Sequence, residues 1–340
     1  MTFASRIWFL LLLSMFATML PFSGSAAPAE SARFVRIGTG PVGGTYFPVG
    51  GAFAQMISEP PGAAPCGLGG TCGVAGLVAA AVSTQGSPDN VRQLASGAIG
   101  LALCQADIAR DAFGGQGLFA RQPVPSLRSI ANLFPETVHV VVRAGGIRTI
   151  GELRGKRVSV GEANSGTLAM ARLVLRAYGV GLRDIEPVYE RLARSADMLV
   201  AGTVDAFFIV GGAPVTAVAL AAETVPLTLL PIDGAPARRL LAAQHSLMPG
   251  TIDAGTYSRV AATPTIAVRA QLLVTTAMSD DLAFAITRAI WDPRNRKVLD
   301  AIPVGLQIQR QTALDNLAVP LHPGARRFYA QGSVAAPGGQ

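Results

Sequence analysis

Apolar runs of strand length alternate with helical patterns along most of the chain, and this alternation limits the possible folds more than any other feature. Strands that alternate with helices indicate an α/β fold, in which helices cover a buried sheet. The hydrophobic content of 50% fits a large core of this kind. The predicted strands are 34–38, 76–82, 99–104, 137–143, 157–161, 204–210, 227–231 and 265–275. The predicted helices are 48–58, 88–96, 105–113, 149–153, 166–178, 195–201, 213–222, 235–243, 280–291 and 312–317.

One helix–glycine–strand unit occurs twice. Residues 94–103 end a helical pattern, pass through Gly97 and enter an apolar strand, and residues 199–208 do the same through Gly202. Glycine is a common residue just beyond a helix end. Two such units favour two lobes of similar construction, although any helix–glycine–strand connection has this appearance.

The N-terminus has the pattern of an export signal. Arg6 precedes an apolar run over 7–20, and small residues follow. This order is typical of a signal peptide. The run is short for a membrane-spanning helix, which is the alternative. We therefore expect residues 1–27 to be a signal peptide cleaved near Ala26 or Ala27, and the mature protein to be periplasmic.

The three cysteines fit an oxidising compartment. Cys66 and Cys72 enclose a glycine-rich loop that can close on itself, so we expect a disulfide between them. Cys104 lies in an apolar run and is expected to be a buried free thiol. No metal site is expected, because the histidines lie far apart and lack the spacing of metal ligands. These histidines are His139, His245 and His322.

A glycine-rich loop follows the first predicted strand of the mature chain. Glycines at 38, 40, 43 and 44 let the backbone turn sharply and let a ligand approach closely. A helical pattern begins at about Pro48, and a helix N-terminus offers free N–H groups and the positive end of the helix dipole. The loop therefore predicts a site for an anionic group.

A second strand–loop–helix unit has the same character. Asn164, Ser165 and Thr167 follow the strand at 157–161 and offer a helix cap together with spare hydroxyl and amide groups. A third loop, at 210–214, also connects a strand to a helix. Each loop is compatible with an ordinary connection. Two of them facing each other across a cleft could hold a carboxylate from both sides.

The sequence offers little support for enzyme chemistry. Gly38, Gly40 and Gly43 match the G-x-G-x-x-G pattern of dinucleotide sites, and Glu59 lies near the expected position of the ribose-binding acid. The following helix stops near Pro60, however, and an exported protein meets little dinucleotide. No Gly-x-Ser-x-Gly elbow is present. We expect no enzyme activity and no cofactor.

The charge pattern argues against nucleic acid as a partner. The net charge of +7 comes from scattered arginines without interleaved aromatic residues. A positive surface would attract small anions.

A series of motifs occurs in the order known from one protein family: 37–48, 87–92, 103–107, 153–161, 164–167, 205–208, 212–214 and 320–325. In these motifs the chain resembles the TAXI family, the TRAP-associated extracytoplasmic solute receptors, also described as immunogenic-protein-like periplasmic binding proteins. Residues 66–83 depart from the commonest family pattern.

The resemblance implies an α/β fold like that of type II periplasmic binding proteins, with two lobes joined by two crossover strands near 135–140 and 260–268. We expect one lobe to comprise 33–137 plus 264–330 and the other 138–263. Residues 331–340 are expected to form a flexible tail.

The resemblance also implies capture of a small organic anion, such as a glutamate-like amino acid or a dicarboxylate, and its delivery to a TRAP-type membrane permease. A monomer is expected. Backbone N–H groups near 43–45 and 165–167 would receive carboxylate oxygens, Tyr46 would wall the pocket, and Asn90 and Gln105 would contact the polar end of the ligand. The implied ligand-binding residues are Thr39, Gly40, Gly43, Gly44, Thr45, Tyr46, Asn90, Gln105, Asn164, Ser165, Gly166, Thr167, Gly212 and Ala213.

Two alternatives remain open at this point: a periplasmic ligand sensor, and an exported enzyme that acts on a small carboxylate. Arg128, Arg143 and Arg172 are each candidates for pairing with a second carboxylate, and their spacing does not choose among them.

Overall fold

The computed structural model describes residues 32–64, 66–70 and 72–333, which belong to one compact unit. The predicted signal peptide, 1–27, lies outside these residues. Helix α10 (Pro323–Ser333) takes in the first residues of the predicted tail, and the rest of that tail is not described. Within the described part of the chain, no helix is both long enough and apolar enough to cross a membrane.

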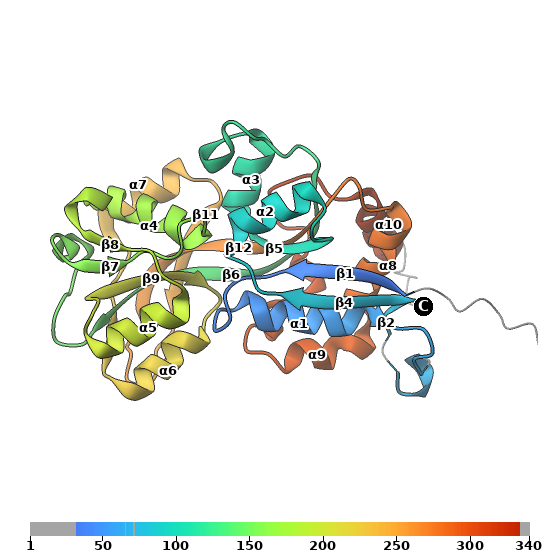
Figure 1. Ribbon diagram of the computed structural model, residues 1–340, viewed down its shortest axis with the longest axis horizontal. Helices are drawn as coiled ribbons and strands as arrows, with labels where there is room; N and C mark the ends of the chain where they lie inside the picture. Colours follow the sequence, from blue (N-terminus) through green and yellow to red (C-terminus); the bar gives the residue numbers. More distant parts are fainter. Residues whose placement is uncertain (1–31, 65, 71, 334–340) are drawn as a thin grey trace, which may run out of the picture. The chain divides into compact units, whose positions relative to one another are not determined.

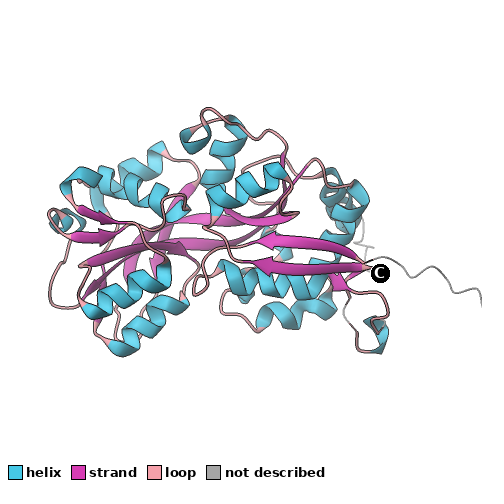
Figure 2. Ribbon diagram, in the orientation of Figure 1, coloured by secondary structure: helices cyan, strands magenta, loops and turns pink. Residues whose placement is uncertain are grey.

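The described strands form one mixed sheet in the order β3-β2-β4-β1-β5-β12-β6-β9-β7-β8, with β10 on β6 and β11 on β12 (Figure 2). Pairs such as β1–β4 and β7–β9 are parallel, whereas β6 and β12 run antiparallel to their neighbours. The strands are β1 (Arg33–Gly38), β2 (Ser58–Glu59), β3 (Val74–Ala75), β4 (Leu77–Val82), β5 (Leu101–Gln105), β6 (Leu127–Arg143), β7 (Arg157–Ser159), β8 (Glu186–Val188), β9 (Ala206–Gly211), β10 (Leu227–Leu229), β11 (Leu247–Ile252) and β12 (Thr263–Thr275).

Helices cover both faces of this sheet. Figure 1 shows α2, α3, α4 and α7 on one side, and α1, α5, α6 and α9 on the other. The predicted α/β class is therefore confirmed. The remaining helices are α1 (Tyr46–Ile57), α2 (Ser87–Ser96), α3 (Ala106–Gly114), α4 (Gly166–Ala177), α5 (Leu192–Ala201), α6 (Thr216–Thr224), α7 (Gly234–Ala243), α8 (Asp280–Ile290) and α9 (Arg296–Asp300).

Two long strands join the halves of the sheet. One half of β12 pairs with β5 and the other half with β11, while β6 pairs with β12 and then with β9. Apolar clusters lie around β1 and β5 in one half, and around β7 and β9 in the other. The two predicted crossover strands are thus confirmed.

Strand β6 begins ten residues before its predicted start at 137, because polar residues interrupt the apolar pattern there. Asn132 is buried; its Nδ2 donates to the carbonyl of Thr312 at 3.1 Å, and its backbone N–H donates to Ala313. These contacts also explain why the predicted helix at 312–317 is wrong. That segment forms turns whose carbonyls bind the strand.

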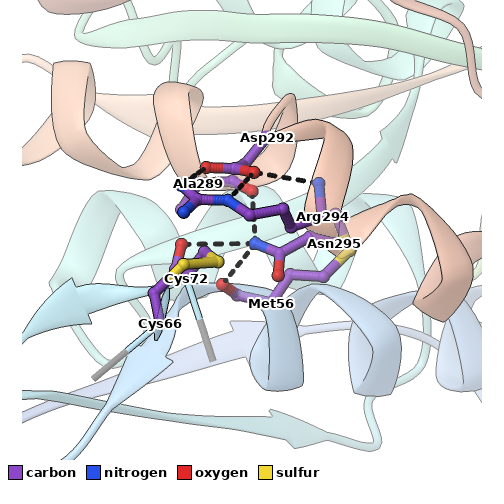
Figure 3. A network of polar contacts seen from close by, with 7 residues as sticks. All are labelled: Met56, Cys66, Cys72, Ala289, Asp292, Arg294 and Asn295. Carbon is purple, nitrogen blue, oxygen red and sulfur yellow. Dashed lines mark hydrogen bonds and ion pairs between the residues drawn. A yellow bond between two sulfur atoms is a disulfide. The ribbon is translucent and has the colours of Figure 1, made fainter. Parts of the chain in front are cut away.

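The predicted disulfide between Cys66 and Cys72 is present, and Cys104 is a buried free thiol. The side chain of Asn295 lies beside this bond (Figure 3). Its Nδ2 donates to the carbonyls of Met56, Cys72 and Ala289 at 3.3, 3.2 and 2.8 Å. One buried amide therefore ties the disulfide loop to the ends of α1 and α8.

Asn295→Ala should destabilise the protein by about 1–3 kcal/mol, because it leaves buried carbonyls without their donor. Urea unfolding would measure this change. Gln122→Ala, at an exposed position, is the matched control and should stay within about 0.5 kcal/mol of wild type. An Asn295→Ala protein as stable as the control would contradict the role given to this amide.

Candidate functional site

A small cavity of about 60 Å³ lies where both halves of the sheet approach each other. On the same measure one water needs about 10–15 Å³, so the space suits a small ligand. Four helices, α1, α2, α4 and α5, begin at its wall. The lining residues are Gly40, Pro41, Gly44, Thr45, Tyr46, Gln85, Gly86, Ser87, Gln105, Glu136, Gly161, Glu162, Ser165, Gly166, Thr167, Glu190, Leu192, Ser195, Phe208, Ile209 and Val210.

The start of α4 presents backbone N–H groups at the cavity. Ser165 caps the helix, since its Oγ accepts a hydrogen bond from the N–H of Leu168 at 3.1 Å. The N–H groups of Gly166 and Thr167 belong to the first turn and have no partner inside the helix. With the helix dipole behind them, they can receive the oxygens of an anion.

Gln105 stands beside this helix start, at the end of β5. It is 3% exposed, and its Nε2 is buried without a hydrogen-bond partner among the described residues. Its Oε1 lies so close to Gly166 that a Cβ there would come within 1.6 Å of it. A buried, unpaired donor costs free energy, and a ligand oxygen would satisfy it.

Glu136 and Tyr46 form a buried pair on another part of the wall. Tyr46 donates its hydroxyl to Glu136 Oε2 at 2.6 Å, and Glu136 is 2% exposed. Burial raises the pKa of Glu136 well above its usual value, and the nearby Asp107 raises it further. Burial also raises the pKa of Tyr46, so its hydroxyl keeps its proton and remains the donor. The Tyr46 hydroxyl is the donor of this pair and the Glu136 carboxyl group is the acceptor, so Tyr46 holds the carboxyl group in place at the cavity wall.

The charges at the cavity are all acidic. Glu136, Glu162 and Glu190 line it, and the described lining includes no Arg, Lys or His. Two of the arginines considered for a second carboxylate are engaged elsewhere: Arg128 with the carbonyls of 125 and 127, and Arg143 with that of 200. The third, Arg172, lines a separate hollow.

The structure brings eight of the fourteen expected site residues to the cavity: Gly40, Gly44, Thr45, Tyr46, Gln105, Ser165, Gly166 and Thr167. It does not bring the other six there: Thr39, Gly43, Asn90, Asn164, Gly212 and Ala213. Asn90 is buried behind the wall, where its Nδ2 donates to the carbonyls of Thr39 at 2.6 Å and Leu103 at 2.7 Å. Its amide therefore fixes the glycine-rich loop.

Gly43 and Gly212 join the two halves of the molecule. Thr45 Oγ1 donates to the carbonyl of Gly212 at 2.8 Å, and the N–H of Ala217 donates to the carbonyl of Gly43 at 3.2 Å. These backbone groups hold the glycine-rich loop against the loop after β9.

Sequence reasoning missed Glu136, Ser87 and Ser195 at the cavity. A signal existed only for Glu136, which is the single acid in the mostly apolar stretch 127–143. Burying an acidic side chain in an apolar strand costs free energy unless it has a polar partner. An acid in such a run therefore indicates either a break in the strand or a buried polar contact.

A family model described as the NMT1-like family matches residues 37–331. Among solved structures, the alkanesulfonate-binding protein SsuA from Xanthomonas axonopodis pv. citri bound to MOPS is 16% identical, with 89% of this chain and 92% of that chain covered and a TM-score of 0.44. The periplasmic aliphatic sulphonate binding protein SsuA from Escherichia coli is 14% identical, with 89% of each chain covered and a TM-score of 0.44. A mutant of ArgBP from T. maritima is 12% identical, with 79% and 94% covered and a TM-score of 0.45. At these TM-scores, none of the three bears on what this chain binds.

Proposed function

The chain belongs to the NMT1-like family, and we propose that it is a periplasmic solute-binding protein that captures a small organic acid in the cavity described above. The observation that carries the proposal is the meeting of the Gln105 side chain, whose Nε2 has no hydrogen-bond partner among the described residues, with the start of α4 at one small cavity. Both elements donate hydrogen bonds, and both suit a carboxylate. The protein binds and releases its ligand without converting it.

Two lobes, 33–137 plus 264–330 and 138–263, close on the ligand by bending at β6 and β12. The lining of the cavity supports this division, since its residues up to Glu136 come from the first lobe and those from Gly161 onward from the second. The contacts of Thr45 with Gly212 and of Ala217 with Gly43 would hold the closed form. Hinge closure of this kind is a common response to ligands.

The closed protein delivers its ligand to a membrane permease of the TRAP type, and the chain is a TAXI-type receptor exported by the signal peptide at 1–27. The order of the sequence motifs from 37–48 to 320–325 supports this assignment. The ligand is a glutamate-like amino acid or a dicarboxylate.

A thermal-shift screen of the mature protein with amino acids, dicarboxylates and 2-oxo acids tests the binding function. A true ligand at about a hundredfold excess over its Kd adds about 2.7 kcal/mol to the free energy of unfolding. NMR of the same mixtures should show the ligand unchanged after incubation. Absence of any shift across the panel, or turnover of the stabilising compound, would contradict the proposal.

A further inference from the structure

We propose that Glu136 selects ligands that carry a protonated amine in addition to their acid group. In this arrangement the acid group meets Gln105 and the start of α4, and the ammonium group meets the carboxylate of Glu136. The inference rests on the proposed function and narrows its ligand class.

The charge balance of the cavity is the first support. Three glutamates line the described wall without a single cationic side chain. A dianion would add two more negative charges to this space. An amino acid brings one charge of each sign, so its ammonium group supplies the counter-charge that the wall lacks. Burying a carboxylate without a counter-charge is costly, and a bound ammonium group reduces that cost.

The hydrogen bonding of Glu136 is the second support. Oε2 accepts from Tyr46, whereas Oε1 has no partner among the described residues. A carboxylate oxygen with free acceptor sites beside a cavity is a suitable partner for an ammonium group, which has three donors and no acceptor.

The groups that face Glu136 from neighbouring elements give no alternative partner. Tyr46 comes from α1, Cys104 from β5 and Asp107 from α3, and all three are neutral or acidic. Glu162 and Glu190 also line the cavity, and Arg191 pairs with Glu162 at 3.5 Å. No cationic side chain among the described lining residues therefore competes with the ammonium group of a ligand for Glu136.

Isothermal titration with matched ligand pairs tests the inference. Each pair differs only in the amine: glutamate and glutarate, alanine and propionate, taurine and ethanesulfonate. For at least one pair, the wild-type protein should bind the amino form about tenfold or more tightly, equivalent to about 1.4 kcal/mol. Glu136→Gln should lose this preference and change its affinity for the amine-free partner by less than about threefold.

Glu186→Gln is the matched control, because it removes an acid from an exposed position at the start of β8, outside the cavity. It should keep the preference for the amine. Should Glu136→Gln fail to fold, Glu136→Asp retains the carboxylate at a shorter reach and should show a reduced preference. Equal binding of both members of every pair would overturn the inference and leave the proposed function intact. An unchanged preference in Glu136→Gln would overturn the inference in the same way. Failure of the wild-type protein to bind any acid would overturn both the inference and the proposed function.

Discussion

Gly166→Ala is expected to weaken ligand binding about a hundredfold, with little loss of stability. The new Cβ would lie 1.6 Å from Gln105 Oε1, so the Gln105 side chain must move. The ligand then loses the amide of Gln105, and the added methyl group crowds the N–H group of residue 166. Two such hydrogen bonds to a charged group are worth about 3 kcal/mol together, which is about two factors of ten. Alanine is otherwise well suited to the first turn of a helix.

Isothermal titration with the most stabilising acid of the thermal-shift screen measures this loss. Gly51→Ala is the matched control, because Gly51 lies in α1 and has no atom within 4 Å of the added Cβ. It should bind normally and gain about 0.5–1 kcal/mol of stability. An affinity for Gly166→Ala within about threefold of wild type would exclude this helix start as the anion site.

Acidification should destabilise the folded protein through His139. This side chain is fully buried and hydrogen-bonded at both ring nitrogens. Tyr257 Oη accepts from the N–H of Val215 at 2.9 Å and donates to Nε2 of the imidazole at 2.8 Å, while Nδ1 donates to the carbonyl of Thr137 at 3.0 Å. The neutral ring satisfies every partner, and the protonated ring would not.

Burial lowers the pKa of His139 to about 4. In the unfolded chain its pKa is about 6.5, so between these values protons bind the unfolded state preferentially. The stability contributed by the neutral ring is complete above about pH 6.5 and is lost as the pH falls toward 4. At pH 4.5 the loss amounts to about 2–3 kcal/mol.

Urea unfolding of the wild type and of His139→Gln at pH 7 and pH 4.5 measures this effect. The free energy of unfolding of the wild type should exceed that of His139→Gln by about 2–3 kcal/mol less at pH 4.5 than at pH 7. Burial raises the pKa of Asp107 to about 6, which favours the folded state as the pH falls, but this contribution is the same in both proteins and cancels in the difference. An advantage that does not vary with pH would contradict the neutral, doubly bonded ring.

Local features of the site could be predicted from the sequence. The cap at Ser165 and the helix that follows are set by residues within one turn of each other. The glycine-rich loop before α1 is similarly local. Such features depend on short-range hydrogen bonds and backbone freedom, which a sequence pattern records directly.

Features that depend on distant contacts could not be predicted. Glu136 reaches Tyr46 across 90 residues, and the role of Asn90 depends on Thr39 and Leu103. In the sequence, Asn90 is an amide near a helix start and looks available to a ligand. Only the structure, in which β1 pairs with β5, shows that the Asn90 amide already donates to two backbone carbonyls.

A crystal structure of the protein with its most stabilising acid would locate the bound ligand. We expect the carboxylate of the ligand to lie within hydrogen-bond distance of the N–H groups of Gly166 and Thr167 and of Gln105 Nε2, enclosed by residues of both lobes. A ligand bound outside this cavity, for example at the arginine-lined hollow beside Arg172 and Arg176, would contradict this expectation.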